Sequence, residues 1–77
     1  MPVVYREGPF VFRIWPADHD PPHVHVYNGD GTCVIEIETG KVRDIRGMRL
    51  PDVNAAGAIA GRNWVRLLAA WRKIHGV

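Results

Sequence analysis

The segment Asn28-Gly29-Asp30-Gly31 constrains the fold more than any other part of the chain, because it separates two runs whose residues alternate between apolar and polar. Asn and Gly readily adopt the positive φ angles of tight β-turns. We therefore predict a β-hairpin formed by His23–Asn28 and Thr32–Glu38. With Gly29 and Asp30 in the turn, the facing pairs are Val26 with Cys33, Val24 with Ile35, His25 with Val34, and His23 with Glu36.

A further strand is predicted on each side of this hairpin. Before it, Phe10–Trp15 alternates and is ended by Pro16, with Val3–Tyr5 as an optional extension. After it, Thr39-Gly40 offers a second tight turn, which would place Val42 beside Ile37, Arg43 beside Glu36 and Lys41 beside Glu38. Asp44 would then lie on the apolar face, which indicates a bulge in this last strand.

The sequence period changes from Asp52 onward, where small and apolar residues recur at helical spacing. They are Val53, Gly57, Ala60, Trp64, Leu67, Trp71 and Ile74. This pattern predicts a C-terminal helix on the sheet, with Trp64 and Trp71 supplying most of the buried area. Glycine disfavours a continuous helix, so a kink or split is expected near Gly61. The predicted fold class is α+β: a small curled antiparallel sheet of three to four strands followed by one C-terminal helix.

Composition bounds the class of protein. The 77 residues fit a single domain over residues 1–77, and no apolar run approaches the roughly 20 residues of a membrane span. The one cysteine, Cys33, cannot form an internal disulfide, which fits a cytoplasmic protein. It lies on the apolar face of the hairpin, so we expect a small buried hydrophobe and not a nucleophile.

Histidines gather behind Pro21-Pro22, which stiffens the backbone. On a strand, His23 and His25 share one face. Metal binding is one interpretation, because two imidazoles with His19 or Asp18 give three ligands and leave one position for water. The candidate metal ligands are therefore Asp18, His19, His23 and His25. Since this spacing is not specific, we predict no resident cofactor and keep zinc as the alternative.

Acid–base chemistry is a second interpretation of the same residues. A neutral and a protonated imidazole can together remove one proton and deliver another, so His23, His25 and His19 are candidate catalytic residues of a metal-independent ribonuclease. A structural role is the third interpretation, in which His23 pairs with Glu36 on a solvated sheet face. His75, near the helix end, is expected to be structural only.

Basic residues are candidate contacts to nucleic acid. Arg43 and Arg46 lie close to the junction of the last strand with the helix, and Arg62 and Arg66 recur along the helix. Arginine forks suit phosphate groups. A solvated helix face gives the same pattern, and the net charge of +2 is too small to decide between them.

Four segments give the chain a family resemblance: Met1-Pro2-Val3-Val4, Asp18-His19-Asp20-Pro21-Pro22-His23-Val24-His25-Val26, Ile35-Glu36-Ile37-Glu38-Thr39-Gly40-Lys41-Val42, and Leu50-Pro51 before the helix that carries Trp71. They resemble the small prokaryotic family known as domain of unknown function 4160. The resemblance runs nearly end to end, although the Ala/Gly-rich start of the helix departs from the charged residues usual in the family. It implies no established activity. Family members are often encoded beside another small protein, as in toxin–antitoxin pairs, so the resemblance implies a protein partner.

We therefore expect a component of a toxin–antitoxin-like two-gene module that acts through a small partner protein or through self-association. Small domains with thin cores gain stability by oligomerising, and an open sheet edge offers a surface for it. The alternatives are the metal-independent ribonuclease, for which RNA is the partner, and a zinc-assisted hydrolase. Whether the chain is an enzyme stays open, and no membrane partner is expected.

Overall fold

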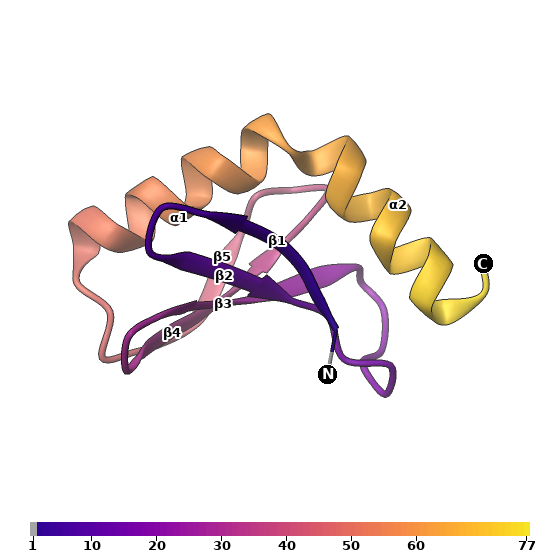
Figure 1. Ribbon diagram of the computed structural model, residues 1–77, viewed down its shortest axis with the longest axis horizontal. Coiled ribbons are helices and arrows are strands. Elements are labelled where there is room, and N and C mark those ends of the chain that lie inside the picture. Colours follow the sequence, from indigo (N-terminus) through magenta and orange to yellow (C-terminus); the bar gives the residue numbers. More distant parts are fainter. Residues whose placement is uncertain (1) are drawn as a thin grey trace.

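The computed structural model describes residues 2–77, and Met1 lies outside the described residues. One antiparallel sheet contains, in sequence order, β1 (Val3–Glu7), β2 (Phe10–Arg13), β3 (His23–Asn28), β4 (Gly31–Glu36) and β5 (Val42–Arg46). Two helices follow, α1 (Leu50–Arg62) and α2 (Trp64–His75), and both arch over one face of the sheet (Figure 1). We call this the inner face and the opposite one the outer face. The predicted α+β class is confirmed.

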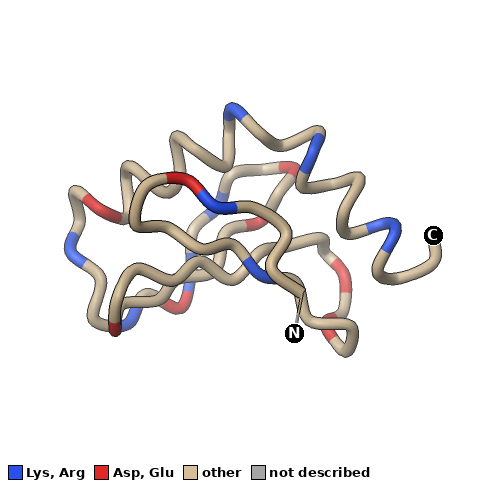
Figure 2. The backbone as a smooth tube through the Cα atoms, viewed as in Figure 1, with Lys and Arg blue, Asp and Glu red and all other residues tan. Residues whose placement is uncertain are grey.

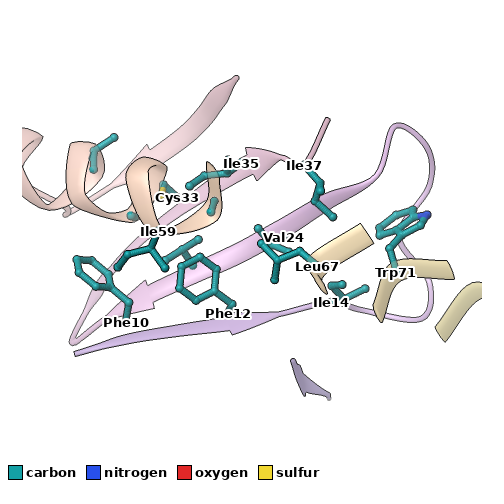
Figure 3. Packing of buried hydrophobic residues seen from close by; sticks show 14 of the residues in the cluster. Phe10, Phe12, Ile14, Val24, Cys33, Ile35, Ile37, Ile59, Leu67 and Trp71 are labelled. Atoms are coloured by element: carbon teal, nitrogen blue, oxygen red, sulfur yellow. The ribbon is translucent and has the colours of Figure 1, made fainter. Parts of the chain in front are cut away.

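The hydrophobic core lies between the inner face and the helices. Strand residues in alternate positions point toward the helical layer, as Figure 3 shows for Phe10, Phe12, Val24, Cys33 and Ile35. Ile59 of α1 and Leu67 and Trp71 of α2 meet them from the other side. Fully burying an apolar side chain of this size stabilises the fold by about 1.5–3 kcal/mol. Packing of these two layers therefore fixes which strand residues face outward.

The β3–β4 hairpin has the predicted register. Val26 faces Cys33, Val24 faces Ile35, His25 faces Val34 and His23 faces Glu36. Gly29 has a φ of 59°, as a tight turn requires. His23 and His25 therefore lie on the side of β3 opposite the buried valines, where His25 is partly exposed and His23 is buried against Trp71 of α2.

The predicted register between β4 and β5 is wrong. Val42 pairs with Ile35 and not with Ile37, because Thr39-Gly40 does not form a two-residue turn. Ile37 is instead buried, and its N–H donates to the Pro22 carbonyl oxygen at 3.0 Å. Because of this contact, Ile37 does not pair with β5, and the connection between β4 and β5 is longer than predicted. The predicted bulge is confirmed, since the register shifts between Thr32 and Val34 and Asp44 has a φ of 54°.

The N-terminal part contains two strands where the sequence predicted one with an optional extension. Gly8, with a φ of 54°, and Pro9 form the turn between β1 and β2. The sheet therefore has five strands and not three to four. The Gly8-Pro9 dipeptide is the turn signal that would have predicted this division.

The helical region is divided at Asn63, close to the split expected near Gly61. The Asn63 side-chain amide donates to the Ile59 carbonyl oxygen at 2.8 Å, and its backbone leaves helical geometry with φ −118° and ψ 18°. The prediction that Trp64 is buried is wrong, since it is 49% exposed, whereas Trp71 is buried as predicted. The break changes the phase of the buried stripe, so Leu68 enters the core after it.

Neither helix has the length and apolar character needed to cross a membrane, over the residues that the structure describes.

Candidate functional site

The loop between β2 and β3 places Asp18 beside the start of β3. The Asp18 N–H donates to the Trp15 carbonyl oxygen at 3.0 Å and closes a β-turn in which Pro16 takes its preferred second position. The Trp15 N–H in turn donates to Asp18 Oδ2 at 3.1 Å. The Asp18 carboxylate is thus oriented by the backbone of its own loop.

Two imidazoles of β3 meet this carboxylate. Oδ2 of Asp18 lies 3.0 Å from His25 Nε2 and 3.4 Å from His23 Nε2. One potential ligand atom from each of the three residues lies within 4.8 Å of the other two. We call Asp18, His23 and His25 the histidine–carboxylate cluster. It unites three of the residues that the sequence singled out.

The hydrogen bonding of His23 determines which ring nitrogen faces the cluster. Its Nδ1 lies 2.8 Å from the Pro21 carbonyl oxygen, which can only accept, so Nδ1 carries a proton. In the neutral imidazole, Nε2 then has a lone pair that faces the negatively charged Asp18 oxygen. Two acceptors in this position need a proton or a metal ion between them. A backbone carbonyl that fixes the second ring nitrogen is also the usual support of a metal-bound histidine.

The cluster is covered on one side and open on the other. The His23 side chain is 8% exposed and lies against Trp71 with a ring-centroid distance of 5.2 Å. The His25 side chain is 26% exposed and the Asp18 side chain 17%. Solvent or a ligand therefore reaches the cluster from the side of His25.

The end of α2 holds the loop that carries Asp18. His75 Nε2 lies 3.1 Å from the Asp18 carbonyl oxygen, and the His75 ring stacks on Trp71 at 3.9 Å. The expected structural role of His75 agrees with this geometry, but its connection to Asp18 was missed. The i, i+4 spacing of Trp71 and His75 on one helix face is the only sequence signal for it.

His19 occupies a different position. It is exposed in the loop, and among the described residues it is not part of the group whose ligand atoms converge. The structure thus brings together two of the three predicted catalytic histidines.

The cluster geometry suits a tetrahedral metal ion. With bonds of about 2.0–2.2 Å from zinc to nitrogen and oxygen, neighbouring ligand atoms lie about 3.3–3.5 Å apart. The two distances to Asp18, 3.0 and 3.4 Å, are close to this separation. Three side-chain ligands leave one coordination position, on the exposed side. The residues present therefore fit a zinc-type centre.

A pocket of about 290 Å³ opens beside His25 on the outer face. Its lining includes polar side chains of β3, β4 and β5, namely Tyr27, Thr32, Asp44 and Arg46. Cys33 also contributes to the lining, and burial raises the pKa of its thiol. The absence of a depressed thiol pKa agrees with the prediction that Cys33 is no nucleophile.

The predicted nucleic-acid contacts are divided between the two layers. Arg62 Nη2 donates to Glu7 Oε2 at 2.8 Å, and Arg66 lies over the Tyr5 ring at 4.9 Å, so both connect the helices to β1. Arg43 and Arg46 belong to β5 instead. Basic positions accordingly occur on both layers in Figure 2. The four predicted arginines therefore do not lie together on one element.

The fold and the cluster define a small α+β protein with two histidines and a carboxylate gathered where the β2–β3 loop meets the sheet. The sequence profile of the family described as Domain of unknown function (DUF4160) matches residues 10–72, and the chain belongs to this family. Comparison with curated proteins and with solved structures gave no match. The family resemblance is thus confirmed, and it assigns no activity.

Proposed function

We propose that the histidine–carboxylate cluster binds a divalent metal ion, with zinc as the first candidate, and that the bound ion activates water for hydrolysis. The observation that carries this proposal is the convergence of His23 Nε2 and His25 Nε2 on Asp18 Oδ2. Two histidines and one carboxylate, with one position left for water, are a ligand set typical of catalytic zinc sites.

The chemistry supplied by such an ion is water activation. Zinc lowers the pKa of its bound water to about 7, so hydroxide is available at neutral pH. A bound ion held by these residues would supply hydroxide for addition to an ester, with the ester bond broken and a proton taken up by the leaving oxygen. No oxidant or reductant is needed. His25, as the more exposed histidine, is the ligand nearest to an arriving substrate.

The burial of His23 favours this role over metal-independent acid–base catalysis. General acid–base catalysis requires each imidazole to reach the proton that it transfers. His23 is covered by Trp71, and its Nδ1 is engaged with the Pro21 carbonyl oxygen. His23 is therefore better placed to bind an ion from the buried side of the cluster than to exchange protons with a substrate.

A role in a two-gene module, through a partner protein or self-association, is independent of this cluster and remains a prediction.

A zinc titration of chelator-treated, untagged protein tests the proposal, with thermal unfolding as the readout. Zinc at about 100 times its dissociation constant adds about 2.7 kcal/mol to the free energy of unfolding. For a domain of this size, we expect Tm to rise by roughly 10–20 °C. Asp18→Asn keeps the side-chain volume and should lose most of this shift. His19→Ala is the matched control, because it removes an exposed histidine from the same loop, and should keep the shift.

Hydrolysis is tested with bis(p-nitrophenyl) phosphate as the probe. Activity should require zinc in wild type and disappear in Asp18→Asn. A wild type that zinc does not stabilise, or an Asp18→Asn variant stabilised as much as wild type, would overturn the metal site. RNA cleavage that persists in excess chelator and is lost in His23→Ala/His25→Ala would establish the metal-independent ribonuclease instead.

A further inference from the structure

The outer face of the sheet presents two rows of side chains that run across the strands. The register places Arg6, Val11, Tyr27, Thr32 and Arg46 opposite one another from β1 to β5. The next row contains Arg13, His25, Val34 and Arg43. Since the residues between them are buried under the helices, both rows face away from the helical layer. His25 of the cluster thus lies in the middle of a face with arginines on both sides.

Only part of this positive charge is neutralised. Arg43 Nη1 lies 3.0 Å from Asp44 Oδ2, and Arg43 Nε lies 3.7 Å from Glu36 Oε2, so Arg43 is occupied by two carboxylates. Within residues 2–77, neither Arg6 nor Arg46 forms an ion pair with an acidic side chain. Arg46 also lines the pocket beside His25. The face therefore attracts anions toward the cluster.

An aromatic ring lies within this charged face. The Arg13 guanidinium carbon is 5.5 Å from the centre of the Tyr27 ring, and Tyr27 lines the same pocket as His25 and Arg46. An aromatic ring near basic side chains offers a surface on which a nucleobase can stack while its phosphates contact arginine. Arg66 of the helical layer also lies over an aromatic ring, that of Tyr5, but Tyr27 is the ring that lines the pocket beside His25.

The distance across the outer face bears on the length of a ligand that contacts both of its sides. Neighbouring strands lie about 4.8 Å apart, so Arg13 on β2 and Arg46 on β5 are separated by about 14 Å across the sheet. This backbone separation gives room for more than one phosphate group between the two arginines. A chain that carries several phosphates can contact both and still pass over His25 between them. The ligand that matches the charge, the aromatic ring and the width is a single-stranded nucleic acid.

We propose that the outer face binds single-stranded nucleic acid across its strands and delivers a phosphodiester to the histidine–carboxylate cluster, where the delivery for cleavage rests on the proposed hydrolytic function. Water adds to phosphorus, one phosphorus–oxygen ester bond breaks, and the products are a phosphomonoester and an alcohol. Arg46 and Arg13 hold the phosphates on either side of the reacting one, and Tyr27 stacks on a base.

Binding is tested without metal, by fluorescence anisotropy of labelled ten-residue oligouridylate and oligothymidylate in excess chelator. Arg13→Gln/Arg46→Gln should weaken binding at least about tenfold and reduce the slope of log affinity against log salt by about 2. Arg62→Gln/Arg66→Gln removes the same charge from the helical layer and should stay within about twofold of wild type. The two labelled strands distinguish RNA from DNA as the source of the phosphodiester.

Three results would overturn the proposal: wild type binds neither strand, both double variants lose affinity equally, or uridine monophosphate displaces the strand as effectively as unlabelled oligomer does. The last result would mean that a single phosphate suffices. Zinc is added afterwards, and cleavage is followed on a gel. If the protein binds the strand but does not cleave it when zinc is added, the hydrolytic function is refuted and the proposed binding surface is supported.

Discussion

Replacing Gly31 with alanine should destabilise the protein, whereas the same replacement at Gly57 should stabilise it. Gly31 begins β4, and a Cβ there would lie 2.8 Å from the Gly47 carbonyl oxygen and 3.1 Å from Met48 Cα. Both neighbours are backbone atoms, so they cannot rotate away as a flexible side chain would. In α1, a Cβ at Gly57 would meet nothing within 4 Å. The two sites therefore contrast crowding with open space.

The magnitudes follow from these contacts. Overpacking costs about 1–3 kcal/mol. Alanine lowers the entropy of the unfolded chain and recovers about 0.4–1 kcal/mol, since Gly31 does not have a positive φ. A net loss of about 1–2 kcal/mol corresponds to a Tm lower by roughly 4–16 °C. Gly57→Ala gains up to about 1 kcal/mol from helix propensity, which raises Tm by up to roughly 8 °C.

Circular dichroism during thermal and urea unfolding measures both variants. Equal urea m-values would show that the denatured states are comparable. A Gly31→Ala variant as stable as wild type, or more stable, would refute the close approach of β4 to Gly47 and Met48. A destabilised Gly57→Ala variant would instead contradict the open space at that position of α1.

Two further predictions concern Cys33 and the ion pair between the layers. Because burial raises the pKa of the Cys33 thiol, native protein should react with a disulfide reagent at pH 8 far more slowly than protein unfolded in urea. The unfolded chain loses this proton at lower pH, so stability should fall as pH rises through the ordinary cysteine range, and Cys33→Val should remove this dependence. Equal thiol reaction rates in the folded and unfolded protein would contradict the burial. A double-mutant cycle with Glu7→Gln and Arg62→Gln should give a coupling below about 1 kcal/mol that shrinks with salt, since both side chains are well exposed. A larger, salt-independent coupling would contradict this expectation.

Local turn chemistry explains which part of the fold could be predicted. The β3–β4 hairpin needs only Asn28-Gly29 and the alternation on either side, and both are local in sequence. The same reasoning failed after Thr39-Gly40, because the Ile37 N–H bonds to the Pro22 carbonyl oxygen in a distant loop. A periodic pattern carries no information about such a contact.

The candidate site shows the same limit. His23 and His25 share a face because a strand alternates, so their proximity could be predicted. The turn that aims Asp18 at them, and the His75 contact from 57 residues away, depend on how the loop meets α2. The exposed Trp64 could not be predicted for a related reason: its environment depends on the change of helix phase at Asn63.

The bulge in β5 affects whether a further strand can add to this edge of the sheet. Asp44, with its φ of 54°, interrupts the regular row of backbone groups that another chain would need for pairing. Arg43, Asp44 and Arg46 add charge along the same edge, and charged side chains on an edge strand oppose the addition of a neighbour. At high concentration, this edge should therefore resist fibril-like stacking, which leaves β1 as the edge more open to strand exchange.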